Sequence, residues 1–284
     1  MTNLHKIRAR IRSVNSTQQI TRTMKMIAVS KLRKTQTSLA GVRLFADKSQ
    51  AVLNALLAGD ANFEHPYLTP RRHVGRVCYV VFWGNRGLCG AYNQLLLRHL
   101  EGLPCSVIVC GRWGRDVLAG TNLPVRQIFS DLSDTPTMAE ALEIAEELKN
   151  LYRTGEADEI HLVYQRFDSV LHQTPTHRQL LPAAPEADAP AANNNYLFVP
   201  DAQTVLDNVL ELYLNNTVYA VMLEARVGEH AARMTAMTAA TDSTAELIED
   251  LNLEFNRARQ AAITTEISEI VGGSAALKKS DKSD

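Results

Sequence analysis

The chain has 284 residues, enough for one or two domains with a substantial hydrophobic core. Its 30 basic and 31 acidic residues nearly balance, which argues against a globally basic nucleic-acid-binding protein. The composition, 45% hydrophobic and 21% charged, is that of a globular protein. The sequence contains no apolar run of about 18 residues and no secretory signal at its start. We therefore expect any membrane association to be peripheral.

Proline and glycine divide the chain into three parts. All ten prolines lie between Pro66 and Pro200, and Gly228 is the only glycine from 201 to 271. Gly41 is the only glycine in the first 58 residues. Because proline costs a helix interior about 3 kcal/mol and glycine about 1 kcal/mol, both terminal segments are predicted to be long helices. We expect an N-terminal helix over 1–60, a central domain over 70–200, a C-terminal helix over 201–277 and a polar tail over 278–284.

Both terminal segments carry apolar residues at helical spacing. The first segment has Leu4, Ile7, Ile11 and Val14, then Ile20, Met24 and Ile27. The last has Ile248, Leu251, Phe255, Ala258 and Ala262, continued by Ile263, Ile267 and Ile270. Helices of this length extend on the order of 80 to 100 Å, wider than the core of one domain. We expect the two stripes to bury each other in a long antiparallel coiled coil, with a loosely packed helical hairpin as the alternative.

The middle of the chain alternates strands and helices. The expected strands are Arg76–Trp83, Cys105–Cys110 and Glu159–Phe167, and the expected helices cover 91–100 and Met138–Tyr152. This order predicts a Rossmann-like α/β domain with a mainly parallel sheet. The segment Pro182–Asn195 is typical of a loop, and Asp201 is a candidate cap for the last helix.

The candidate chemical sites of the central domain are weak. Gly84, Gly87 and Gly90 stand between a strand and a helix, where phosphates often bind, but their spacing fits neither the dinucleotide motif nor the P-loop. We therefore interpret this loop as a structural turn. The cysteines and the central histidines lack metal-ligand spacing, and we interpret them as core, strand or loop residues: Cys78, Cys89, Cys105, Cys110, His161, His172 and His177. The sequence predicts no catalytic residue, cofactor site or metal site.

The N-terminal segment is strongly basic. Residues 1–46 carry ten Lys or Arg and no acid, whereas the remainder holds 20 basic and 31 acidic residues. Single-stranded nucleic-acid binders interleave aromatic residues, and the first 44 residues contain none. A membrane-surface helix needs a stronger apolar face. An acidic protein surface is the favoured partner among these three.

Three sequence blocks resemble a known family. The first is Ile7–Lys34, and the second is Arg86-Gly-Leu-Cys-Gly90 followed by Asn93. The third consists of Glu229–Asp242 and Phe255–Gly273. In order and spacing they resemble the F-type ATP synthase gamma subunit over essentially the whole chain. The residues Phe82–Asn85 depart from the usual pattern, and the cysteine pair of redox-controlled chloroplast members is absent.

This resemblance implies a rotor shaft. In the family, the coiled coil enters the hexamer of alpha and beta subunits, and the α/β domain lies near the epsilon subunit and the membrane c-ring. Nucleotide chemistry belongs to the beta subunits, so we expect this chain to be non-catalytic and present in a single copy. The implied location is peripheral, at the cytoplasmic face of a bacterial membrane. The resemblance implies no nucleic acid as a partner.

The resemblance also implies subunit contacts. Met24 and Lys25 match positions where the shaft passes the lower part of the beta subunits. The other matching positions face a beta loop or are weaker candidates of the same kind: Arg259, Gln260, Thr264, Glu266 and Arg233. Spacing alone favours ordinary solvated helix residues at these positions, and it is the resemblance that favours subunit contacts.

Two other functions stay open at this point. An enzyme with a nucleotide site in the α/β domain would need convergent polar residues around Gly84–Gly90, which the sequence does not supply. A coiled-coil adaptor binding an acidic protein surface would explain the helices but not the three sequence blocks.

Overall fold

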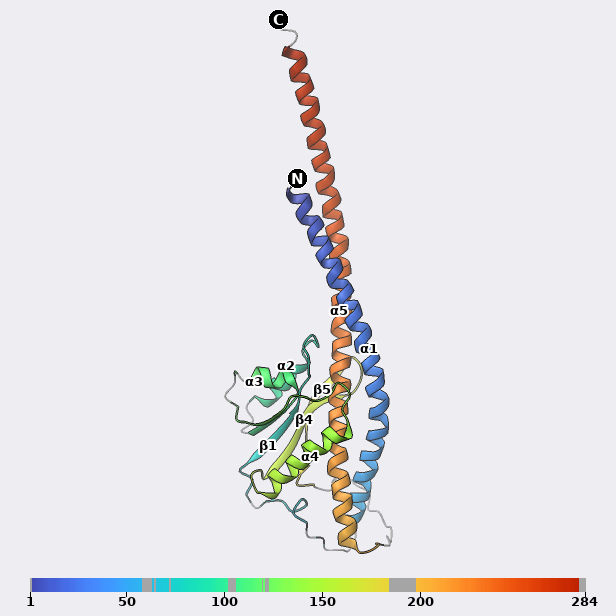
Figure 1. Ribbon diagram of the computed structural model, residues 1–284, viewed down its shortest axis with the longest axis vertical. Coiled ribbons are helices and arrows are strands. Elements are labelled where there is room, and N and C mark those ends of the chain that lie inside the picture. Colours follow the sequence, from blue (N-terminus) through green and yellow to red (C-terminus); the bar gives the residue numbers. More distant parts are fainter. Residues whose placement is uncertain are drawn as a thin grey trace. The chain divides into compact units, whose positions relative to one another are not determined.

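The computed structural model describes residues 2–57, 63, 65–71, 73–101, 106–118, 120, 123–183 and 198–280 (Figure 1). The chain divides into two compact units, which are considered separately below. Unit 1 consists of Met1–Met26 and Met237–Asp284, and unit 2 consists of Ile27–Ala236. Three sequence predictions lie wholly or largely outside the described residues: Cys105, the loop at Pro182–Asn195 beyond Ala183, and the end of the polar tail beyond Ser280.

The two terminal segments form the long helices that the sequence predicts. Helix α1 spans Thr2–Leu57 and helix α5 spans Ala202–Ser280. Asp201 caps α5 as expected, because its Oδ1 accepts a 2.9 Å hydrogen bond from the backbone N–H of Thr204. None of the described helices is long and apolar enough to cross a membrane.

In unit 1, the two helices pack in opposite directions. The guanidinium of Arg8 lies over the ring of Phe255, 5.3 Å from its centroid. Further along α1, Thr21 Oγ1 accepts a 2.9 Å hydrogen bond from the hydroxyl of Thr241. The residue numbers of the paired positions rise along α1 and fall along α5, so the two helices are antiparallel. Ile7 and Leu251 are buried in this contact.

The buried stripe of α1 differs from the predicted one after Val14. Ile20 and Ile27 are 59% and 50% exposed, whereas Thr21 and Ala28 are buried. The buried and half-buried positions of α1 still follow one another at steps of three and four residues. Such a seven-residue repeat keeps the same side of the helix toward its partner, whether or not the residues at those positions are apolar. The prediction that the stripe continues through Ile20 and Ile27 was wrong, since it followed apolarity and lost the phase, whereas Met24 is half-buried and does lie on the stripe.

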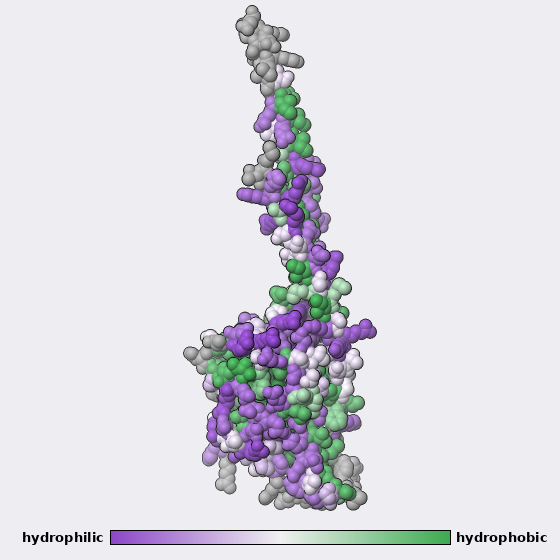
Figure 2. Space-filling model, viewed as in Figure 1, coloured by the Kyte–Doolittle hydropathy of each residue, from purple (hydrophilic) through white to green (hydrophobic). Residues whose placement is uncertain are grey.

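The predicted stripe of α5 ends earlier than expected. Ala258 and Ala262 are half-buried, but Ile263, Ile267 and Ile270 are exposed. Hydrophobic side chains are visible on the surface toward this end of α5 (Figure 2). Arg8 already lies opposite Phe255, so the described part of α1 offers no further turn opposite these three isoleucines. The prediction that they extend the buried seam was wrong for the chain by itself.

The central domain contains a five-stranded sheet in unit 2. The strands are β1 (Val77–Phe82), β2 (Ser106–Cys110), β3 (Val125–Phe129), β4 (Glu159–Phe167) and β5 (Gln173–Leu181). They lie in the order β3-β2-β1-β4-β5, and all neighbours are parallel except β4 and β5. The mainly parallel α/β sheet is confirmed. The sequence missed β3 and β5, the two edge strands, which have mostly half-buried or exposed residues rather than an apolar run.

Helices cover both faces of the sheet. One face packs against α4 (Met138–Arg153) and the first part of α5 through a core that includes Val80, Leu148 and Leu214. The other packs against α2 (Tyr92–Leu100) and α3 (Arg112–Leu118) through Val81, Leu96 and Leu118. The sheet is therefore the middle layer of three, and α5 is part of the core of the central domain.

The end of the seam gives a first testable prediction. Leu251 is 3% exposed, and we expect Leu251→Ala to lower the free energy of unfolding by about 2–5 kcal/mol through lost contacts and a cavity. Ile267 is 57% exposed, so Ile267→Ala is the matched control and should change stability by less than about 0.5 kcal/mol. Denaturant unfolding followed by circular dichroism measures both. Equal losses would contradict the assigned end of the seam.

Candidate functional site

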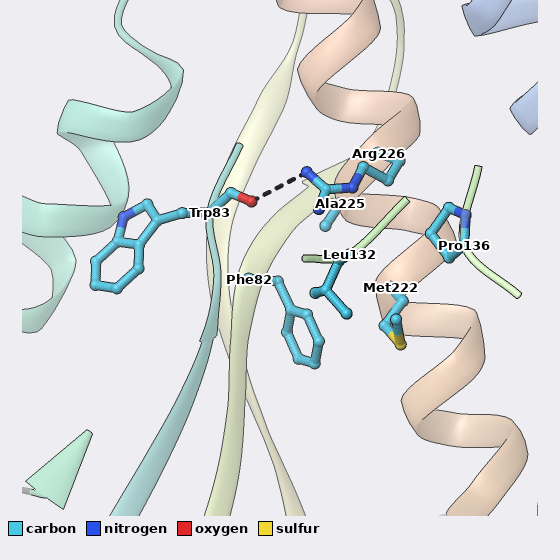
Figure 3. A pocket seen from close by; sticks show the side chains of 7 residues that line it. All are labelled: Phe82, Trp83, Leu132, Pro136, Met222, Ala225 and Arg226. Atoms are coloured by element: carbon cyan, nitrogen blue, oxygen red, sulfur yellow. Dashed lines mark hydrogen bonds between the residues drawn. The ribbon is translucent and has the colours of Figure 1, made fainter. Parts of the chain in front are cut away.

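A small cavity lies between the end of β1 and α5 (Figure 3). Its volume is about 10 Å³, room for about one water molecule. Arg226 closes one side by donating a 3.2 Å hydrogen bond from Nη1 to the carbonyl of Trp83. The remaining lining residues are Phe82, Leu132, Pro136, Met222 and Ala225. This cavity cannot hold a nucleotide or any comparable ligand.

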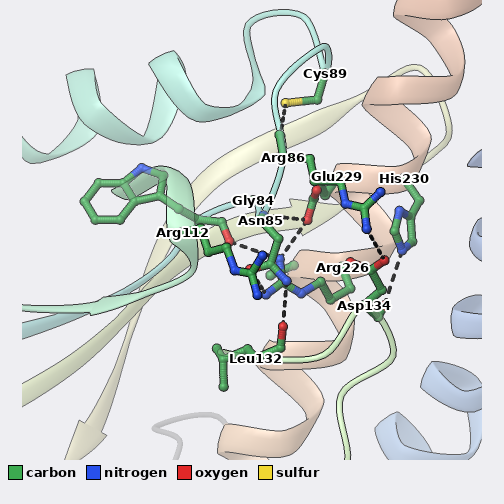
Figure 4. A network of polar contacts seen from close by, with 12 residues as sticks. Gly84, Asn85, Arg86, Cys89, Arg112, Leu132, Asp134, Arg226, Glu229 and His230 are labelled. Carbon is green, nitrogen blue, oxygen red and sulfur yellow. Dashed lines mark hydrogen bonds and ion pairs between the residues drawn. The ribbon is translucent and has the colours of Figure 1, made fainter. Parts of the chain in front are cut away.

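Next to the cavity, three charged side chains of α5 form a buried network (Figure 4). Glu229 accepts a 2.7 Å bond at Oε2 from Arg226 Nη1 and a 2.5 Å bond at Oε1 from Arg233 Nη2. The three side chains are only 2–8% exposed. Their spacing, i to i+3 and i to i+4, places them on neighbouring turns of one helix face. Each buried guanidinium is thus paired with the same carboxylate.

The network holds the loop that follows β1. Asn85 donates its backbone N–H to Glu229 Oε2 at 3.3 Å and accepts a 2.9 Å bond at Oδ1 from Arg226. Its amide Nδ2 donates to the carbonyl of Leu132 at 2.7 Å. Arg233 donates to the carbonyls of Arg86 and Gly87, at 3.1 and 3.3 Å. The side chains of α5 therefore bind both a backbone N–H group and carbonyl oxygens of this loop.

Two of the loop glycines have a local reason. At Gly84, an added Cβ would lie 3.1 Å from both Asn93 Oδ1 and Glu229 Cδ, so a side chain would press on the network. Gly90 has a φ of +59°, a conformation in which side chains are strained. The backbone N–H of Gly84 donates to Asn93 Oδ1 at 2.9 Å. Because the amides of Gly84 and Asn85 are bonded to side chains of the protein itself, they are not a phosphate cradle, and the loop has the geometry of a structural turn.

Asp134 extends the network toward α1. Its carboxylate forms an ion pair with Lys31 and lies 3.5 Å from Nη2 of Arg86, while its carbonyl lies 3.4 Å from Nε2 of His230. The contacts thus join α1, α5, the loop after β1 and the loop before α4. All of these residues lie within unit 2.

The charges of the network set its protonation. Burial raises the pKa of Glu229, but the positive charges of Arg226 and Arg233 outweigh burial and lower that pKa. Burial lowers the pKa of His230. At neutral pH the site therefore contains an ionised carboxylate and a neutral imidazole.

The residues that the sequence nominates for subunit contacts lie apart from this network, with one exception. Arg233 is a buried member of it. In unit 1, Met24 lines a shallow groove with Ile20, and Lys25 is half-buried beside the seam. The four positions on α5 are exposed: Arg259, Gln260, Thr264 and Glu266. Thr264 donates its hydroxyl to the backbone carbonyl of Gln260 at 2.9 Å, a bond within the helix.

Sequence reasoning missed the roles of Asn85, Asp134, Arg226 and Glu229. A usable signal was present, because Arg226, Glu229 and Arg233 have intrahelical ion-pair spacing inside a helix stretch that is mostly apolar. Their loop partners are remote in sequence, so only the fold identifies them. Within the described ranges, no three His, Cys, Asp or Glu side chains are arranged to hold a metal ion.

Fold and network together define an α/β domain fastened to a long antiparallel pair of helices. A family profile described as ATP synthase matches residues 3–277. The ATP synthase gamma chain of Desulfitobacterium hafniense is 43% identical, with 98% of this chain and 100% of the relative covered. That of Heliobacterium modesticaldum is 42% identical with the same coverage.

Solved structures share the fold. A chain of the Euglena gracilis mitochondrial ATP synthase, from a structure of OSCP, F1 and c-ring, aligns with a TM-score of 0.70 at 19% identity, over 97% of this chain and 95% of that one. A chain of the Tetrahymena thermophila central stalk and c-ring aligns with a TM-score of 0.54 at 20% identity, over 78% and 99%. With its full-length relatives above 40% identity, this chain belongs to the ATP synthase gamma chain family.

The network predicts a specific stability effect. Glu229→Gln leaves two buried guanidiniums without their counter-charge, so we expect the free energy of unfolding to fall by about 3–5 kcal/mol. Glu143→Gln, on the exposed face of α4, is the control and should change it by less than about 0.5 kcal/mol. Urea unfolding at pH 7 measures the difference. Similar small effects of both variants would show that Glu229 does not neutralise the network.

Proposed function

We propose that this chain is the gamma subunit of the F1 sector of a rotary ATP synthase and acts as its central shaft. In this role it transmits torque between an ion-driven c-ring and the catalytic beta subunits, and so couples ion flow to ATP synthesis or hydrolysis. The observation that carries the proposal is the full-length similarity to bacterial gamma chains. By this proposal the chain contributes no catalytic residue of its own.

The physical features of the described residues support a shaft. Helices α1 and α5 contain no proline. Charged side chains and several large apolar side chains are exposed on their surfaces. Five basic residues of α1 are exposed in unit 1: Lys6, Arg8, Arg10, Arg12 and Arg22. A surface of this kind suits contact with a surrounding ring of acidic partner surfaces.

We further propose which part of the chain contacts which subunits. Segments 1–60 and 201–277 form the shaft within the hexamer of alpha and beta subunits, ahead of the polar tail 278–284. The domain 70–200 faces the epsilon subunit and the c-ring. One copy serves each complex, at the cytoplasmic face of the membrane. Subunit contacts are made by Met24, Lys25, Arg233, Arg259, Gln260, Thr264 and Glu266.

Affinity capture of the tagged chain from native membranes tests this function. We expect alpha, beta, epsilon and c subunits among the captured proteins. We also expect the purified chain alone to turn over no ATP, since the first two amides of the loop after β1, those of Gly84 and Asn85, are bonded to side chains of the protein itself. Capture of an unrelated acidic partner without these subunits would favour a coiled-coil adaptor. Turnover by a preparation free of alpha and beta would contradict the non-catalytic role.

The exposed side chains on α5 allow a direct test of the shaft contacts. If Arg259 and Gln260 reach a beta subunit, Arg259 makes charge-assisted bonds worth about 1.5–3 kcal/mol each. The double variant Arg259→Ala and Gln260→Ala should fold normally, because alanine favours helix. Coupled ATP synthesis in membranes should fall more than about tenfold, the effect of about 1.4 kcal/mol on a barrier.

A matched control is available in unit 2. Arg153→Ala with Gln203→Ala removes the same residue types from exposed positions on α4 and α5. We expect this pair to leave ATP synthesis within about twofold of the parent. If the Arg259 and Gln260 double variant assembles and synthesises ATP at the parent rate, these residues are solvated helix residues and the contact assignment is wrong.

A further inference from the structure

Three histidines gather where α2 meets the sheet. His161 lies on β4, His177 on β5 and His99 in the last turn of α2. The ring centroids of His99 and His177 are 5.4 Å apart, and those of His161 and His177 are 5.9 Å apart. Three imidazoles thus lie within contact distance although they come from three separate elements.

The contact between His99 and His177 depends on protonation. Nε2 of His99 lies 3.2 Å from Nδ1 of His177. One nitrogen must donate and the other must accept, so at least one ring has to be neutral. When both rings are protonated, all their nitrogens carry hydrogen, and the bond is replaced by repulsion between two cations.

The surroundings supply little negative charge to offset that repulsion. Tyr79 on β1 stacks on His161 at 5.2 Å and lies edge-on to His177 at 6.5 Å. Glu159 Oε2 is 3.0 Å from Nε2 of His161, so this carboxylate is engaged by one imidazole already. Partial burial lowers the pKa of His177, and the charges of His99 and His161 lower it further.

The His99–His177 bond joins helix α2 to strand β5, two elements that are far apart in the sequence. Strand β5 is an edge of the sheet and pairs through its backbone only with β4. The histidine bond ties β5 to α2 across 78 residues of chain. Loss of this bond would loosen the edge strand while leaving the parallel core strands β1, β2 and β4 in place.

We propose that His99, His161 and His177 form an acid-sensitive latch that holds α2 against edge strand β5 at neutral pH and opens as the imidazoles take up protons. Because the folded state favours the neutral ring of His177, its contribution to stability is present above about pH 6.5 and is lost as the pH falls. Each linked proton changes the opening equilibrium by up to about tenfold per pH unit. The opening is local, as expected for an edge element.

Hydrogen exchange followed by mass spectrometry tests the latch in the full chain. Exchange is compared at pH 7.5 and 5.5 in the presence of EDTA, with rates corrected for the intrinsic effect of pH. We expect peptides covering 92–101 and 173–181 to lose protection at least about fivefold at pH 5.5, and peptides from β1 and β2 to change less than about twofold. In His177→Gln and His99→Gln, the protection of these two peptides should no longer depend on pH.

His172→Gln is the matched control. His172 is an exposed histidine in the turn between β4 and β5, where its backbone N–H donates to Ser169 Oγ at 3.1 Å. This variant should keep the pH response of the parent. An unchanged pH response in His177→Gln would overturn the latch. So would a loss of protection spread evenly over unit 2, which would assign the acid sensitivity to His65 or His230, whose pKa values burial also lowers.

Discussion

A stretch in the first half of α5 is buried on every side, and much of the structure depends on this constraint. From Ala220 to Ala231 each residue is buried, in the core between the sheet and α1. A helix in such a position cannot point its charges to water, and an unpaired buried charge costs several kcal/mol. Glu229 therefore pairs with Arg226 and Arg233, and the remaining donors and acceptors bind the loop after β1.

The same constraint shapes the glycine-rich loop after β1. In many α/β proteins, such a loop offers free amides to a phosphate. In this chain, a carboxylate from α5 lies at the loop and accepts the N–H of Asn85. The loop became an attachment point between the α/β domain and the helices, and the absence of room for a nucleotide at the adjoining cavity follows from the same packing.

Outside the buried segment of α5, polar side chains take part in the contact between the two helices and large apolar side chains are exposed. In unit 1 the seam uses Thr21 and Thr241, and large apolar side chains such as Ile20 and Ile267 face outward. A narrow seam with apolar residues on the outer surface suits helices that contact other proteins along their length, which agrees with the proposed role as a shaft. The histidine cluster lies apart from this surface, in the α/β domain between α2 and β5.

Local patterns in the sequence determined a large part of the fold. The absence of proline predicted α1 and α5, the apolar runs predicted β1, β2 and β4, and Asp201 marked the start of α5. These features arise from backbone propensity and short-range periodicity, which act within a few residues. The sequence did not predict the edge strands β3 and β5, because strands with exposed faces carry no apolar run.

Only the tertiary structure decided the phase of the seam, the network around Glu229 and the histidine contact. Thr21 is buried and Ile20 exposed because the partner helix selects positions by geometry. Arg226, Asn85 and Leu132 meet because the sheet and α5 pack together, and His99 reaches His177 for the same reason. The sequence shows which residues need partners, but contacts between residues so far apart in the chain exist only once the chain has folded.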